Sequence, residues 1–186
     1  MQSYEYARRK GVMKISWGYF YKLSMRLAEQ LEAYNPEMVL GIARGGLFPA
    51  TAVACMLRRE LYPIRLTRRL NDEVVYEKPV WKCPVPSSVK GASVAVIDEI
   101  SDSGETLAMA SDEVRKAGAR VVITASLVSH SWANPTPTIS ADISDALIIF
   151  PWDQKVFIDG MWVPHPEIVT AMAAQDDPKS TGISDN

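Results

Sequence analysis

The chain has 186 residues, enough for one well-buried domain and too few for two of ordinary size. Its 47% hydrophobic and 23% charged residues are typical of globular proteins, and its net charge of −2 gives no basic field that would attract a nucleic-acid backbone. The composition therefore predicts one folded domain over residues 1–175, a polar tail over 176–186, and no nucleic-acid partner.

The two cysteines, Cys55 and Cys83, lie in very different contexts, one in an apolar helical pattern and one in a polar segment flanked by proline. A disulfide framework is therefore not expected. No stretch approaches the ~18 consecutive apolar residues of a membrane span, and no apolar run follows the polar N-terminus. We expect a cytoplasmic protein without a membrane partner.

The first predicted element is an amphipathic helix that begins after Ser16, whose hydroxyl can cap it, and stops at Asn35-Pro36. Its apolar residues recur at helical spacing: Phe20, Leu23, Leu27 and Leu31.

A short apolar strand over 38–43 follows, and it ends in Arg44-Gly45-Gly46 before an almost wholly apolar helix that reaches Leu57. A second strand is predicted over 64–67. The charged, proline-containing stretch from 68 to 90 then reads as a long loop, and such loops in compact domains are usually functional or mobile.

The remaining pattern alternates strands and helices. Strands are predicted over 94–97, 121–128 and 146–150, with helices over about 107–117 and 164–174. Continuous apolar strands that alternate with helices indicate an α/β fold with a mostly parallel, five-stranded sheet covered on both faces. Ligands of such sheets bind beyond the carboxyl ends of the strands.

The most informative stretch is Val94–Leu107, in which a buried strand runs into Asp98-Glu99 and then into a glycine-containing loop at the start of a helix. Adjacent carboxylates can accept hydrogen bonds from vicinal hydroxyls and can gather a hard cation. The backbone N–H groups at the helix start can bind a phosphate. The alternative is structural: Asp98 and Asp102 would then serve as turn and capping residues.

This stretch resembles the phosphoribosyl-pyrophosphate motif of type I phosphoribosyltransferases, which has an apolar strand, two acidic residues and a loop of the Thr/Ser-Gly-x-Thr kind. The resemblance implies that Asp98 and Glu99 hold the ribose hydroxyls and the Mg²⁺ cofactor. It also implies that Asp102 accepts the proton of the base. The residues that would hold the 5′-phosphate are Ser103, Gly104, Glu105 and Thr106.

Gly41–Gly46 is similar to the pyrophosphate loop of the same family, with Ala43, Arg44 and Gly45 as the implied diphosphate contacts and Arg44 as a catalytic cation. Alone, Arg-Gly-Gly is a weak signal and is more often a plain tight turn. Arg69, in the predicted loop, is a further candidate for diphosphate binding, with a solvated surface as the alternative.

The sequence Phe150-Pro151-Trp152-Asp153 is similar to the end of the last strand in the xanthine and guanine branch of the family. Two residues depart from that branch. The aliphatic Leu147 stands where a stacking aromatic is usual, and His130 stands where a lysine is usual. The candidate base-binding residues are Leu147, Ile148, Trp152, Asp153 and His130.

The resemblance implies transfer of a phosphoribosyl group from phosphoribosyl pyrophosphate to a nucleobase, with a 6-oxopurine expected as the acceptor. Two alternatives remain: a sensor that binds phosphoribosyl pyrophosphate without turnover, and the same chemistry on a non-purine acceptor. A base-covering hood is expected from about 129–165 together with the N-terminal segment. The resemblance also implies a homodimer, and residues 160–174 are a candidate contact.

Overall fold

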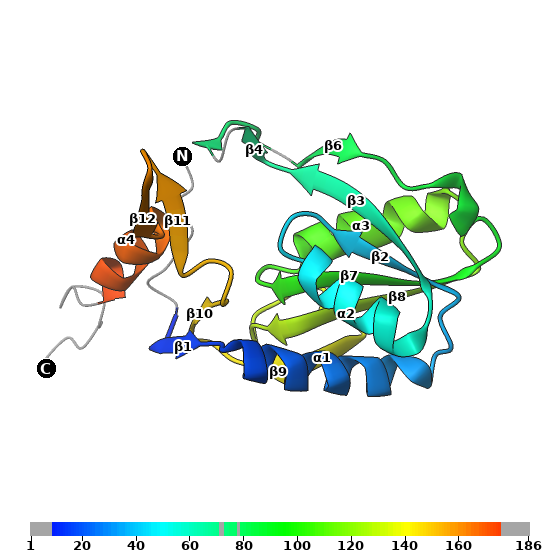
Figure 1. Ribbon diagram of the computed structural model, residues 1–186. Coiled ribbons are helices and arrows are strands. Elements are labelled where there is room, and N and C mark those ends of the chain that lie inside the picture. The colour runs from blue at the N-terminus through cyan, green and yellow to red at the C-terminus, as the bar shows by residue number, and fades with distance from the viewer. Residues whose placement is uncertain (1–8, 71–72, 78, 176–186) are drawn as a thin grey trace, which may run out of the picture. The chain divides into compact units, whose positions relative to one another are not determined.

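The computed structural model describes residues 9–70, 73–77 and 79–175 (Figure 1). Two compact units divide the chain: Tyr21–Ser144 form one, and Met1–Phe20 with Asp145–Asn186 form the other. The expected polar tail, 176–186, lies outside the described residues. The extent of the hood, about 129–165 with the N-terminal segment, remains a prediction.

The larger unit is built on a six-stranded sheet with the order β6-β3-β2-β7-β8-β9. Five of these strands pair in parallel, and β6 pairs with β3 antiparallel at one edge. The strand bounds are β2 Met38–Ile42, β3 Glu60–Thr67, β6 Val80–Cys83, β7 Ser93–Ser101, β8 Val121–Ser129 and β9 Ile139–Ile143.

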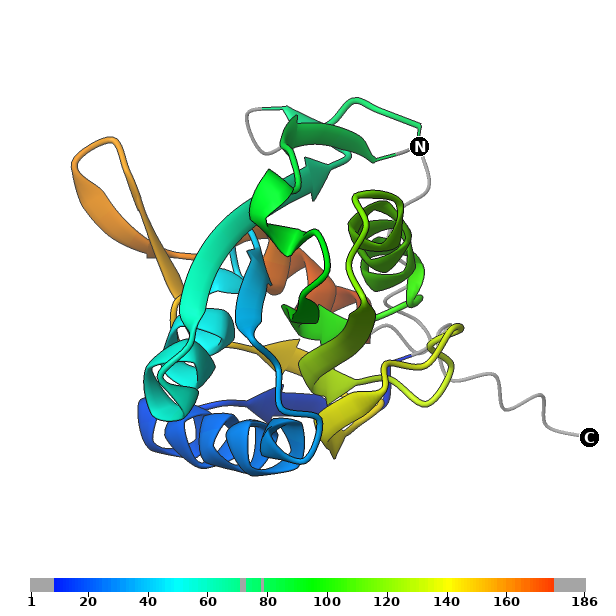
Figure 2. The ribbon, with the colours of Figure 1, turned by 90° about the vertical axis from the view of Figure 1, so that its right-hand side faces the viewer.

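Three helices, α1 (Trp17–Glu32), α2 (Leu47–Leu57) and α3 (Glu105–Lys116), precede or connect the strands. The N–H of Tyr19 donates to Ser16 Oγ over 3.1 Å, so the predicted cap of α1 is present. Helices α2 and α3 cover opposite faces of the sheet (Figure 2). This follows because the β2–α2–β3 and β7–α3–β8 crossovers run in opposite directions along the sheet.

Alternate strand residues supply the core, since successive side chains of a strand point to opposite faces. On the α3 side, aliphatic residues of three parallel strands pack against Leu107, Ala110 and Val114 of the helix. On the other face, strand β2 lies very close to helix α2: a Cβ at Gly41 would lie 2.7 Å from Ala50 Cβ. The central strands are therefore buried on both faces, as their apolar sequences predict.

The smaller unit contains a parallel pair, β1 (Val12–Lys14) with β10 (Leu147–Ile149), and an antiparallel hairpin, β11 (Lys155–Ile158) with β12 (Met161–Pro164). Helix α4 (Pro166–Gln175) follows the hairpin, and its Ala171 is buried with Leu147 and Ile149.

The α/β fold with a mostly parallel sheet is confirmed, but the fifth parallel strand is β9 and not the predicted strand over 146–150. That segment forms β10, which pairs with β1 instead. The sequence of β9 mixes polar and apolar residues and follows a proline-rich turn, so the apolar pattern alone did not mark it.

The stretch from 68 to 90, predicted to be irregular, also contains strand structure. It holds the short hairpin of β4 (Arg69–Leu70) with β5 (Glu73–Val74), then β6, then the 3₁₀ turn η2 (Ser87–Val89). Among the described residues, no helix is both long enough and apolar enough to cross a membrane.

Candidate phosphoribosyl-pyrophosphate site

The loop after β2 and the acidic pair of β7 lie against each other because β2 and β7 are parallel neighbours. A Cβ at Gly46 would lie 2.8 Å from Asp98 Oδ1 and 2.6 Å from the Ile42 carbonyl oxygen. A Cβ at Gly45 would overlap the Glu99 carboxylate. Two motifs about fifty residues apart in sequence thus meet at the carboxyl edge of the sheet, and only glycine allows this approach.

The acidic pair belongs to β7 itself, which continues to Ser101, whereas the sequence placed the pair at the end of the strand. Asp98 pairs with Ser126 in the ladder and is 7% exposed, and the N–H of Glu99 donates to Asp98 Oδ1 over 3.0 Å. The strand therefore fixes the backbone of both acidic residues.

Burial raises the pKa of the Asp98 carboxyl, although its hydrogen bonds with Glu99 oppose this effect. Burial also raises the pKa of Glu99 well above its ordinary value, and the charge of Asp98 adds to that rise. Two adjacent carboxylates in this environment favour a bound cation, because a cation would compensate the cost of their charges.

The donor set fits Mg²⁺ in one particular way. Within the described ranges, no group of three or more histidine, cysteine, aspartate or glutamate side chains could hold a metal ion. Mg²⁺ often uses only one or two carboxylates and completes its octahedron with water and substrate phosphates. Asp98 and Glu99 beside a candidate diphosphate loop match that mode rather than an all-protein cage.

The loop before α3 has the features of an anion-binding turn. Gly104 has a φ of 88°, and the N–H of Glu105 donates to Ser103 Oγ over 3.3 Å. The first helical hydrogen bond runs from the Ala108 N–H to the Gly104 carbonyl, so the N–H groups of Thr106 and Leu107 precede it. Ser103 thus provides a side-chain oxygen at this helix start.

This loop is held by the segment that follows β8. The Asn134 N–H donates to the Ser103 carbonyl over 2.8 Å, and the His130 N–H donates to the Ser101 carbonyl over 3.0 Å. A Cβ at Gly104 would overlap the Pro135 carbonyl oxygen. The conformation of the anion-binding turn therefore depends on a loop about thirty residues further along the chain.

Of the other predicted contacts, Ala43 donates its N–H to the Ile64 carbonyl, and Arg44 is exposed at the start of the turn into α2. Arg69 lies in β4, in the hairpin that follows β3.

His130 was expected to contact a base, but its side chain is fully buried, and its Nδ1 lies 2.6 Å from the Ser144 carbonyl. The ring stacks on Trp132, whose Nε1–H donates to Asp102 Oδ1 over 3.1 Å. The sequence pattern did not single out Trp132. Its place just after a parallel strand, at the ligand-binding edge, was the signal that could have identified it.

The remaining candidate base residues belong to the smaller unit. Leu147 is 4% exposed and packs in the core of this unit with Ala171. Its role in base binding stays a prediction. Ile148 is half-buried and pairs with Met13 in the β1–β10 ladder.

Trp152 is half-buried in an aromatic cluster of the smaller unit: it stacks on Phe150 at 4.8 Å and meets Phe20 edge-on at 5.4 Å. Asp153, also half-buried, donates its N–H to the Phe150 carbonyl in the adjoining turn.

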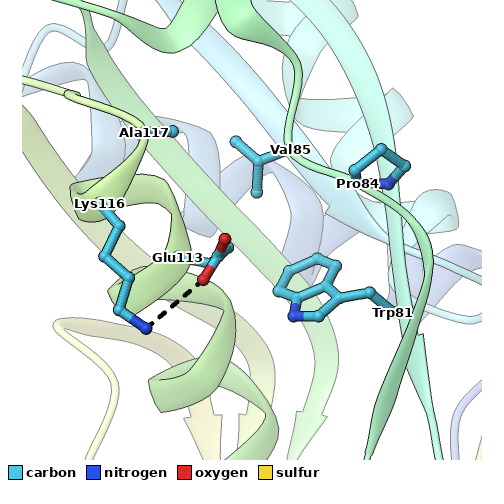
Figure 3. Close-up of a pocket in the computed structure, with 6 residues that line it drawn as sticks. All are labelled: Trp81, Pro84, Val85, Glu113, Lys116 and Ala117. Atoms are coloured by element: carbon cyan, nitrogen blue, oxygen red, sulfur yellow. Dashed lines mark ion pairs between the residues drawn. The ribbon is translucent and has the colours of Figure 1, made fainter.

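A separate pocket of about 390 Å³ lies between β6 and the C-terminal part of α3 (Figure 3). Trp81 and Val85 face Glu113 across it, and Glu113 pairs with Lys116 at 3.5 Å. Glu113 and Lys116 lie near the end of α3 opposite to the anion-binding turn, so this pocket is distinct from the candidate site.

The parallel sheet, with glycine turns and acidic residues at its carboxyl edge, defines an α/β protein of the class that binds phosphorylated ligands at that edge. The chain belongs to the phosphoribosyl transferase domain family, which matches residues 16–161. It is therefore a phosphoribosyltransferase by family, and this family uses phosphoribosyl pyrophosphate and a nucleobase.

Relatives that are named for different nucleobases support this family membership. The chain is 28% identical over 149 residues to a xanthine-guanine phosphoribosyltransferase of Cereibacter sphaeroides, covering 76% of this chain and 87% of the relative. It is 27% identical over 130 residues to an adenine phosphoribosyltransferase of Thermosipho africanus, covering 66% and 76%. A purine phosphoribosyltransferase structure from Pyrococcus horikoshii superposes with a TM-score of 0.71 and 30% identity, covering 81% of this chain and 99% of that one. The expected resemblance is confirmed.

Proposed function

We propose that this protein transfers the 5-phosphoribosyl group from phosphoribosyl pyrophosphate to a 6-oxopurine such as xanthine, guanine or hypoxanthine, with Mg²⁺ as cofactor. One observation carries the proposal: Asp98 and Glu99 lie directly against Gly45 and Gly46. This contact brings groups for ribose hydroxyls and a cation next to a glycine turn suited to a diphosphate.

In the proposed reaction a base nitrogen forms a bond to carbon 1 of the ribose while the bond from that carbon to the pyrophosphate oxygen breaks. The pyrophosphate leaves with the electron pair, and Arg44 stabilises its charge. Asp102 accepts the proton that the base nitrogen loses. Mg²⁺, when bound, neutralises part of the diphosphate charge. The turn from Ser103 to Thr106 holds the 5′-phosphate and so fixes the ribose for in-line attack.

The choice of a 6-oxopurine rests on the likeness to the xanthine-guanine relative and on Phe150-Pro151-Trp152-Asp153. The adenine relative makes adenine the first competing acceptor to test. A sensor without turnover is the other candidate, since the features described above serve binding as well as catalysis.

The discriminating experiment incubates the protein with phosphoribosyl pyrophosphate, Mg²⁺ and one base at a time: xanthine, guanine, hypoxanthine, adenine or orotate. Pyrophosphate release and nucleotide formation are measured. Turnover with a 6-oxopurine is expected, and it should stop when Mg²⁺ is chelated. Turnover with adenine or orotate alone would replace the proposed acceptor. Binding of phosphoribosyl pyrophosphate without turnover of any base would support the sensor in place of the enzyme.

The site assignment is tested separately by calorimetry of phosphoribosyl pyrophosphate in Mg²⁺. Replacing Asp98 by Asn together with Glu99 by Gln should weaken binding at least tenfold, or about 1.4 kcal/mol. Asp112→Asn, an exposed aspartate on α3 that pairs with Arg115, is the matched control and should change the affinity less than twofold. Equal affinities in folded double variant and control would refute the assignment.

We also propose that the protein acts in the cytoplasm as a homodimer. The β11–β12 hairpin offers apolar surface for such a contact, because Phe157 is 61% exposed and Trp162 is 68% exposed. Light scattering after size exclusion should give twice the mass of one chain, and Trp162→Glu should lower it. A single-chain mass for the unmodified protein would contradict the dimer.

A further inference from the structure

Asp102 is held by two aromatic side chains from the segment after β8. The indole Nε1–H of Trp132 donates to Asp102 Oδ1 over 3.1 Å. The imidazole of His130 stacks under this indole with a centroid distance of 4.3 Å and an interplanar angle of 17°. Its Nε2 lies 3.8 Å from the same Asp102 oxygen. Two side chains from one segment thus converge on one carboxylate.

The orientation of His130 follows from its other nitrogen. Nδ1 lies 2.6 Å from the Ser144 carbonyl oxygen, which can only accept a hydrogen bond, so Nδ1 carries a proton. Nε2 then faces Asp102. The ring is fully buried, and rotating it by half a turn would break the hydrogen bond between its Nδ1–H and the Ser144 carbonyl. His130 is therefore a fixed support under Trp132.

The Asp102 side chain remains 31% exposed while its Oδ1 is engaged. The indole N–H donates along a direction fixed by its ring and so orients the Asp102 carboxylate.

We infer that Trp132 and His130 are positioning residues that hold the Asp102 carboxylate in the orientation needed to accept the proton of the base. This inference rests on the proposed function. Trp132 supplies the hydrogen bond, and His130, fixed by the Ser144 carbonyl, keeps the indole in place. Neither residue needs to touch the substrate.

Trp132→Phe tests the hydrogen bond, because it keeps an aromatic ring over His130 and removes only the donor. It should lower kcat about tenfold and leave the KM for phosphoribosyl pyrophosphate within twofold. Trp81→Phe, another half-buried tryptophan at a distance from the site, is the matched control and should leave kcat within twofold. An unchanged kcat for Trp132→Phe would overturn the inference.

A double-variant cycle tests whether Trp132 acts through Asp102. In the Asp102→Asn background, adding Trp132→Phe should lower kcat no further, because the positioned carboxylate is already gone. Losses that multiply would show that Trp132 acts independently, and they would overturn the inference.

A measurement that needs no turnover separates this inference from the proposed function. In ¹⁵N-labelled protein, the Trp132 indole resonance is assigned by its loss in Trp132→Phe. It should move in Asp102→Asn and in His130→Asn, which can still donate to the Ser144 carbonyl, and stay in place in Asp112→Asn. A resonance unmoved by Asp102→Asn overturns the inference. Absence of turnover with every base, together with a resonance that moves as expected, would refute the proposed function and leave only the Trp132–Asp102 contact established.

Discussion

The segment Asp98–Thr106 of the larger unit and the segment Leu147–Asp153 of the smaller unit use their side chains differently. In the first, the backbone of β7 and of the turn before α3 places carboxylates and N–H groups at the sheet edge. In the second, Leu147 is buried in a core and Trp152 is engaged with other rings. Recognition through the backbone can be read from a short motif, whereas recognition through side chains depends on what packs around them.

The largest effect is expected from Gly104→Ala, which should distort the turn before α3 in the first segment. The residue has a φ of 88°, and the new Cβ would overlap the Pro135 carbonyl oxygen. We expect a loss of about 3 kcal/mol in the free energy of unfolding, and binding of phosphoribosyl pyrophosphate too weak to measure by calorimetry. Denaturant unfolding and calorimetry check both expectations.

Gly91→Ala is the matched control for Gly104→Ala. Gly91 has a φ of 78°, but nothing lies within 4 Å of its Cβ position. Its loss should be about 1 kcal/mol, from backbone strain alone, and ligand binding should persist. Equal losses for the two variants would show that the contact with Pro135 does not matter.

An intermediate effect is expected from Trp152→Leu in the second segment. This change removes the ring that stacks on Phe150, and it should cost about 2 kcal/mol of stability. The KM for the base should rise several-fold, while the dissociation constant of phosphoribosyl pyrophosphate should stay within twofold, because its candidate residues lie in the other unit. Steady-state kinetics and calorimetry separate the two quantities.

Tyr34→Leu controls for the loss of an aromatic ring as such. Tyr34 is 46% exposed, and its replacement should change neither stability nor KM appreciably. If Trp152→Leu weakened phosphoribosyl pyrophosphate binding as much as base binding, the assignment of phosphoribosyl pyrophosphate to the first segment and of the base to the second would be wrong.

The smallest effect concerns the acidic pair without ligand. Because burial raises the pKa of Glu99, the folded state keeps its proton to higher pH than the unfolded chain, whose glutamate has the ordinary value of 4.5. The ligand-free protein should therefore lose stability as the pH rises from 4.5 through the folded-state pKa of Glu99. Glu99→Gln should flatten this loss and raise the melting temperature at pH 7 by a few degrees.

Glu29→Gln, an exposed glutamate on α1, should leave the same pH profile of the melting temperature unchanged. Adding Mg²⁺ with phosphoribosyl pyrophosphate should stabilise the unmodified protein at pH 7 more than the Glu99→Gln variant, because the cation compensates the paired charges. A steeper fall of stability with pH in Glu99→Gln would contradict the burial argument.

The sequence by itself determined the parallel α/β sheet, the cap at Ser16, and the position of the acidic pair and the glycine turns. These features depend on local hydrophobic periodicity and on glycines where two backbone segments approach closely. Both can be recognised within short stretches of sequence. Sequence did not find β9 or the hairpin β4–β5, because their short, partly polar strands carry no strong pattern.

Only the tertiary structure decided that Gly45 and Gly46 meet Glu99 and Asp98, that Leu147 is a core residue, and that Trp132 binds Asp102 while His130 is buried beneath it. The physical reason is that these facts depend on which strands become neighbours and on which way a side chain points. Both are set by packing between residues far apart in the chain, and no short stretch of sequence contains that information.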